Sequence, residues 1–167
     1  FENKNSRIME NVLSLAYFYT ADRPWNKYYG NEKLRIRLEK ALDYWLSLRN
    51  EEGCFFTAGW KDFANTAFAT KFLGETLILL NQGPPIDEDL FKRSVKAQRE
   101  AVLKILKGDD YFNRGKLYSN QYGNIWPGAL AYLELFPDSK IEKLLRKRLK
   151  QSKENFQSPA GYFYEAD

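Results

Sequence analysis

The run GCFF at residues 53–56 decides the fold, because two similar runs occur later in the chain, GDDYF at residues 108–112 and GYFY at residues 161–164. In each run a glycine is followed closely by at least two aromatic side chains, and the glycines are spaced by about 55 and about 53 residues. A glycine near a helix end can supply a left-handed cap, and the aromatic pair can then turn the chain back inward. The spacing therefore predicts an internal repeat of one helical hairpin.

Charged amphipathic helices are expected before these runs, over residues 31–50, 87–107 and 139–156. In the first of them Leu34, Leu38 and Trp45 recur at helical spacing, and charged residues fill most other positions. Asp87 and Ser139 are suitable N-caps for the second and third helices.

More apolar helices are expected between them, over residues 6–21, 61–81 and 121–136. Their residues are small or aromatic on several faces, and a helix that is apolar on most sides is a buried helix. Buried inner helices and amphipathic outer helices thus alternate in one all-α domain over residues 1–167, as about three helical hairpins of an incomplete (α/α) toroid. An array that stops open leaves an apolar end uncovered. We therefore expect a piece of a larger toroid, or packing against another copy or chain.

Composition narrows the function classes. The chain is 44% hydrophobic and 29% charged, which is typical of a soluble globular protein. No apolar run reaches the roughly 18 residues of a membrane span, so no membrane partner is expected. The chain has no histidine, which excludes a His-based triad, an imidazole base and the usual zinc sites. No metal or cofactor is expected, and the single Cys54 excludes an internal disulfide.

The net charge restricts the possible functions less than the composition does. The net charge of +4 is compatible with an acidic polymer as partner. The lysine- and arginine-rich stretch 140–150 alternates with leucine at core spacing, which indicates a solvated outer face. No nucleic-acid partner is therefore expected.

Residues 113–124 read NRGKLYSNQYGN, a polar, aromatic, glycine-punctuated loop that leads into an apolar helix. Loops of this kind carry chemistry more often than packing. The run resembles the catalytic loop of polysaccharide lyases with an α/α-toroid domain, the chondroitin, hyaluronan and heparinase-like enzymes. There a run of the form H-G-P-Q-L-Y-S-G-G-Y-G supplies a histidine and a tyrosine. Tyr122 stands at the tyrosine position, and Asn113 stands at the histidine position.

The resemblance implies β-elimination on a uronic-acid sugar. The sugar carboxylate must be neutralised by an amide or cation before a base can take the C5 proton, and an acid then protonates the leaving oxygen. It implies Asn65, near the start of an inner helix, as the neutralising amide and Tyr122 as base and acid. A tyrosine acts as a base near neutral pH only beside cations, for which Arg114 and Lys116 are candidates.

The remaining candidates would bind substrate. The resemblance suggests Trp60, Tyr118 and Trp126 as sugar platforms, and Asn120 as a further substrate contact. Asn113 could hydrogen-bond substrate or mark loss of activity. The implied partners are an acidic polysaccharide and the missing remainder of the toroid or further β domains. The substrate class implies a secreted or periplasmic location.

Other interpretations of these residues stay open. Asn65 could be a buried amide that hydrogen-bonds to a backbone group. Tyr122 could cap the helix that follows it and pack against a neighbouring aromatic ring. A six-hairpin glycoside hydrolase would need two carboxylates across the scissile bond. The nearest acidic residues are Asp62, Glu75, Asp109 and Asp110, but Glu75 falls in a buried helix where it could pair with Lys71. A non-catalytic helical module that binds carbohydrate or protein is the third interpretation.

Overall fold

The computed structural model describes residues 8–50, 53–57, 60–61 and 63–163. Its long helices are α1 (Met9–Thr20), α2 (Glu32–Ser47), α3 (Phe63–Gln82), α4 (Glu88–Lys107), α7 (Ile125–Leu135) and α8 (Ser139–Asn155). Shorter elements are α5 (Asp109–Gly115), α6 (Ser119–Gly123) and the antiparallel strands β1 (Phe56–Thr57) and β2 (Trp60–Lys61). The all-α prediction is confirmed.

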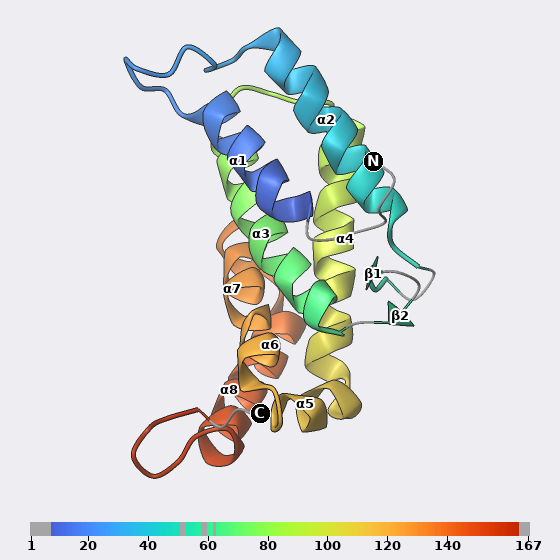
Figure 1. Cartoon of the computed structure of the whole chain (residues 1–167), viewed down its shortest axis with the longest axis vertical. Coiled ribbons are helices and arrows are strands. Elements are labelled where there is room, and N and C mark those ends of the chain that lie inside the picture. Colours follow the sequence, from blue (N-terminus) through green and yellow to red (C-terminus); the bar gives the residue numbers. More distant parts are fainter. Residues whose placement is uncertain (1–7, 51–52, 58–59, 62, 164–167) are drawn as a thin grey trace.

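The six long helices form three hairpins in two layers. Inner helix α3 contacts α1 on one side and α7 on the other, while outer helix α4 contacts α2 and α8. Each inner helix also packs on the outer helix of its own hairpin. Figure 1 shows the hairpins stacked along the long axis, from α1–α2 at one end to α7–α8 at the other. The hairpins of the described residues thus form an open array.

Small side chains bring the inner helices α3 and α7 close together. A Cβ added at Gly74 would lie 2.8 Å from the Cβ of Ala131, and one added at Gly128 would lie 2.7 Å from the backbone of Thr70. The buried Gln98 of α4 donates from Nε2 to the carbonyls of Thr70 (2.8 Å) and Gly128 (2.9 Å). One amide therefore ties three helices together in the core.

The predicted repeat is visible in the turns after α2 and α8. Arg49 and Phe55 form an isolated antiparallel bridge, and Gln157 and Phe163 form the same bridge two hairpins further on. The glycines inside these turns, Gly53 and Gly161, have φ of 80° and 87°, which glycine adopts without strain.

The middle repeat departs from this pattern. Gly108 has φ of −71° and is the N-cap of α5, so the left-handed cap predicted there is wrong. The chain continues directly from α4 into α5, where Asp109 and Asp110 occupy the first turn and suit the helix dipole. Because the chain stays helical after α4, most of the expected loop 113–124 is helical as well. The expected helix 121–136 is divided between α6 and α7.

The N-cap predictions had mixed outcomes. Asp87 caps α4 by accepting from the backbone N–H of Leu90 at 2.8 Å, as predicted. The cap of α8 is Asp138, not Ser139, because the Asp138 carboxylate accepts from both Lys140 and Ile141 at 3.0 and 3.1 Å. The other oxygen of the Asp138 carboxylate pairs with Arg99. Because Asp138 is the N-cap, Ser139 is the first residue of the helix.

Candidate functional site

The predicted site residues belong to the segments that return from outer to inner helices. These segments are the β1–β2 hairpin before α3 and the α5–α6 pair before α7. In Figure 1, α5, α6 and the turn after α8 gather at the lower end of the array. An inner helix begins beside each return, so polar side chains in these segments lie near helix N-termini.

Tyr122 lies in the core and not at a surface. Its ring is fully buried and packs edge-on against Phe112 and Phe156, with ring centroids 5.6 Å apart in both pairs. Gly115 packs directly against the base of the Tyr122 side chain, since a Cβ added at Gly115 would lie 2.7 Å from the Tyr122 Cβ. The hydroxyl forms no hydrogen bond with any described residue.

This position does not fit the predicted role of Tyr122 as a base. Burial raises the pKa of the phenol well above its ordinary value, and the nearby Arg148 guanidinium offsets this only in part. A base for the C5 proton needs contact with substrate and an accessible phenolate. The sequence pointed to Arg114 and Lys116 as the cations beside this phenol, whereas the cation that acts on it is Arg148.

Arg148 was expected on a solvated outer face and is instead 2% exposed. Its guanidinium donates to the carbonyls of Leu106 (2.8 Å) and Lys107 (3.3 Å), which are the last carbonyls of α4, and to the carboxylate of Asp109 (2.7 Å). The guanidinium carbon also lies 4.8 Å from the centroid of Phe112. Helix periodicity could have indicated this burial, since Arg148 follows Ile141 and Leu145 on the same face of α8.

Asn65 lies in the first turn of α3 and is 9% exposed. The next residue, Thr66, accepts from the backbone N–H of Phe55 at 3.1 Å, which fixes the turn after α2 against α3. Asn65 is therefore held at the predicted end of an inner helix but is almost enclosed. Trp60 lies in β2, where the backbone is described and the side chain is not, and Asp62 lies outside the described residues.

The polar residues of α5 lie on the surface. Asn113, Arg114 and Lys116 are exposed. The Arg114 guanidinium carbon lies 5.2 Å from the ring centroid of Phe63, at the start of α3, so α5 brings this cation to the N-terminus of an inner helix. Lys116 lies over the ring of Phe112, with Nζ 5.7 Å from its centroid.

Asn120 and Trp126 share a small surface cavity of about 220 Å³ with Ser119, Gly123 and Phe163. The rings of Trp126 and Phe163 lie 6.2 Å apart, and the indole Nε1 forms no hydrogen bond with a described residue. Ligand pockets usually measure roughly 300–1,000 Å³, so this cavity suits one ring of a polymer better than a whole oligosaccharide. Two of the candidate substrate contacts, Asn120 and Trp126, therefore line one cavity.

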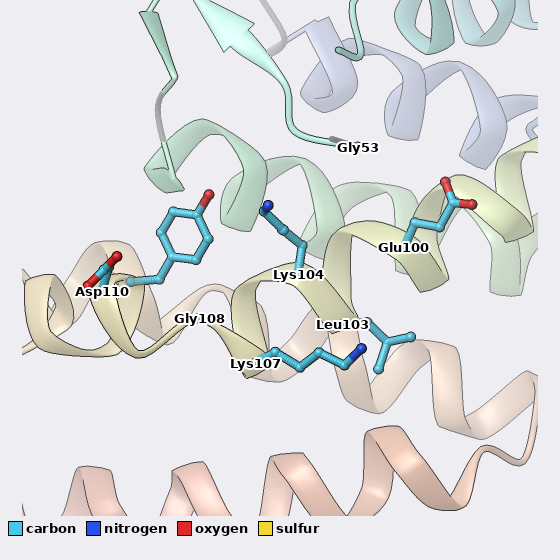
Figure 2. Close-up of a pocket in the computed structure, with 8 residues that line it drawn as sticks. Gly53, Glu100, Leu103, Lys104, Lys107, Gly108 and Asp110 are labelled. Atoms are coloured by element: carbon cyan, nitrogen blue, oxygen red, sulfur yellow. The ribbon is translucent and has the colours of Figure 1, made fainter. Parts of the chain in front are cut away.

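A larger cleft, of about 650 Å³, lies between the Gly53 turn and the α4–α5 junction, and sequence reasoning missed it. Glu100, Lys104, Lys107, Asp110 and Tyr111 are among its lining residues. In Figure 2 the Lys104 side chain extends from α4 toward the Gly53 turn. The cleft mixes two cations with two carboxylates. It includes Asp110, a candidate carboxylate of the hydrolase alternative, and none of the residues predicted for the lyase site.

Comparison with known protein families, curated proteins and solved structures finds no match to this chain. None of the described helices combines the length and apolar character of a membrane span. Among the same residues, no group of three or more His, Cys, Asp or Glu side chains could hold a metal ion.

Proposed function

We propose that this chain belongs to a polysaccharide lyase that cleaves a uronic-acid polymer by β-elimination. The observation that supports this best is that the adjoining helices α5, α6 and α7 carry cation, amide and aromatic side chains at two neighbouring places. Arg114 lies beside Phe63, and Asn120 lines a cavity with Trp126. These are the groups needed to hold an acidic sugar ring and neutralise its carboxylate.

The chemistry assigns these groups distinct tasks. Trp126 and Phe163 would hold the sugar through the apolar faces of its ring. Asn65, Asn120 and Arg114 would donate to the sugar carboxylate, because removal of the C5 proton beside an unneutralised carboxylate creates a costly dianion. Asn113 and Lys116 would contact neighbouring sugars along the exposed face of α5.

The proposal gives the proton transfer to Tyr118 instead of Tyr122. Tyr118 is the other phenol of the same segment, precedes α6 and is only half-buried. Its backbone carbonyl accepts from Gln121 and Tyr122 at 3.1 and 3.2 Å, which fixes its place at the start of α6. A phenol that reaches the surface can meet a substrate proton, and a fully buried phenol cannot.

A non-catalytic module that binds an acidic polysaccharide is the second candidate. The burial of Tyr122 favours it, because the residue at the tyrosine position of lyases is removed from solvent. A hydrolase has less support. Asp109 is tied to Arg148, and Glu75 is exposed in a groove between α1 and α3 instead of buried beside Lys71 as expected.

One experiment separates these functions. The chain is incubated with hyaluronan, chondroitin sulfate, heparin and alginate while ultraviolet absorbance of an unsaturated product is followed. A rise in absorbance supports the lyase. New reducing ends without absorbance would show hydrolysis, and binding without either product would show a non-catalytic module; both outcomes overturn the lyase proposal.

A further inference from the structure

At the opposite end of the array, the last turn of α1 and the connection from α1 to α2 carry a group of exposed aromatic rings. Each of these rings is at least 41% exposed, and Trp25 reaches 60%: Tyr17, Phe18, Trp25, Tyr28 and Tyr29. Single exposed aromatic residues are common, but a contiguous group marks a binding surface more often than chance exposure. We call these five residues the aromatic platform.

Four of the five rings of the platform are linked through Phe18. Trp25, Tyr28 and Tyr17 all meet its ring edge-to-face, with centroid distances of 6.4, 6.1 and 5.7 Å. Edge-to-face pairs stabilise each other beyond their shared burial, so the rings support one another at the surface. The exposed faces are therefore presented in a fixed arrangement.

The backbone under the platform is fixed as well. Asn26 is buried and donates from Nδ2 to the carbonyls of Phe18 and Ala21, both at 2.7 Å, and its Oδ1 accepts from the N–H of Tyr28 at 3.1 Å. Gly30, with φ of 61°, donates to the carbonyl of Tyr19 at 2.9 Å. A surface that is ordered before its ligand arrives avoids much of the entropy loss of binding.

The Tyr19 hydroxyl anchors the platform to the neighbouring hairpin. It donates to the carbonyl of Pro85, in the turn between α3 and α4, at 2.9 Å. The platform is thus joined to the body of the array and is not an independent flap.

Two cations flank the platform. Arg23 and Lys27 are exposed, and neither forms an ion pair with a carboxylate among the described residues. The Lys27 Nζ lies 5.3 Å from the ring centroid of Tyr28. A groove of about 550 Å³ between α1 and α3 continues from Tyr17 and Phe18, but it is mostly apolar and contains the exposed Glu75 carboxylate. An acidic ligand is therefore expected to stay at the platform and not to follow this groove.

We propose that the aromatic platform is a second site for acidic polysaccharide, which holds the polymer without acting on it. The ligand class rests on the proposed function. The apolar face of a sugar ring packs on Trp25 and Tyr28, and its carboxylate meets Arg23 and Lys27. These two cations form no ion pair within the described part of the chain, and their charge favours an anionic sugar over an apolar protein partner. The site lies at the end where inner helices lead to outer helices, away from Trp126.

The test uses Trp25→Ala and Lys27→Ala in the full chain, with Tyr162→Ala as the matched control. Tyr162 is 77% exposed and lies outside the platform. Binding to size-defined oligosaccharides of the same four polymers, and to neutral dextran, is measured by calorimetry. Circular dichroism confirms that each variant is folded. We expect Trp25→Ala to weaken binding of an acidic oligosaccharide about tenfold or more, Lys27→Ala to weaken it less, and Tyr162→Ala to leave it unchanged.

The outcomes separate this inference from the lyase proposal. Loss of binding in Trp25→Ala, in a chain that forms no unsaturated product, supports the platform and overturns the lyase. Elimination activity together with unchanged binding in Trp25→Ala overturns the platform alone. Wild-type binding to none of the acidic oligosaccharides, or equal binding to dextran, also overturns the platform.

Discussion

At the residue scale, the Tyr122 side chain combines full burial with an unpaired hydroxyl. A buried hydroxyl without a partner costs about 1–3 kcal/mol, whereas the ring contacts with Phe112 and Phe156 are retained by phenylalanine. We therefore predict that Tyr122→Phe keeps the free energy of unfolding or raises it by up to about 1 kcal/mol, as measured by urea denaturation.

The control for this prediction is Tyr122→Leu, which removes the aromatic contacts. It should lower the free energy of unfolding by about 2–4 kcal/mol. A destabilised Tyr122→Phe would show that the hydroxyl has a partner, and would reopen its role at the site.

Arg148 joins the end of α4 to the start of α5 through a single guanidinium. Its removal leaves two helix-terminal carbonyls without this donor, whereas the Asp109 carboxylate, whose side chain is 81% exposed, stays hydrated. We predict that Arg148→Met lowers the free energy of unfolding by about 2–4 kcal/mol. The matched control is Arg146→Met on the same helix. Its 77% exposed side chain pairs with Glu142 alone among the residues that the structure describes, and its loss should cost about 0.5 kcal/mol or less. Equal effects of the two variants would contradict this account of Arg148.

The same contact predicts an acid dependence of stability. The hydrogen bond and charge of Arg148 hold the pKa of the Asp109 carboxyl below its usual value. The carboxylate therefore stabilises the fold above the unfolded pKa of about 3.9, and this stabilisation is lost as the pH falls through the lowered folded pKa. Between about pH 5 and about pH 2, the wild type should lose more unfolding free energy than Asp109→Asn. Parallel pH profiles for the two proteins would rule out this contribution.

At the element scale, the contact between α3 and α7 depends on missing side chains. An alanine Cβ at Gly128 would meet the Thr70 backbone, which cannot rotate away as a side chain can. We predict that Gly128→Ala lowers the free energy of unfolding by about 2–3 kcal/mol, by forcing the two inner helices apart. The control Gly123→Ala meets only ring atoms of Trp126 at 3.6 Å or more, in ordinary contact, and should be neutral or slightly stabilising. The reverse order of the two variants in a denaturation series would contradict the close packing of α3 and α7.

Elements also show what local sequence can predict. The leucine spacing of 31–50 and the capping group of Asp87 predicted α2 and α4 because both signals act within a few residues. The α8 cap was misplaced by one residue, because the choice between Asp138 and Ser139 depends partly on Arg99, far away in the chain. Gly108 was misread for a similar reason, since α5 is held by Arg148 of α8.

At the scale of the whole molecule, the 53-residue to 55-residue repeat predicted the order of hairpins and the alternation of inner and outer helices. The site was predicted less well. Asn120 and Trp126 do share a cavity, but Tyr122 and Arg148 are buried where sequence reasoning expected a cleft and a solvated face. Burial of one side of a helix follows from periodicity, whereas the partner of a buried phenol or guanidinium is set by helices that meet only in three dimensions.

The proposal as a whole depends on an acidic sugar losing its C5 proton to a phenol at the meeting point of α5, α6 and α7. The most direct measurement is the rate of ultraviolet absorbance increase on a uronic-acid polymer for the wild type, Tyr118→Phe and Tyr122→Phe. The account predicts turnover in the wild type and in Tyr122→Phe, and its loss in Tyr118→Phe with binding retained. An active Tyr118→Phe beside a folded but inactive Tyr122→Phe would contradict it, and so would the absence of an unsaturated product from every polymer.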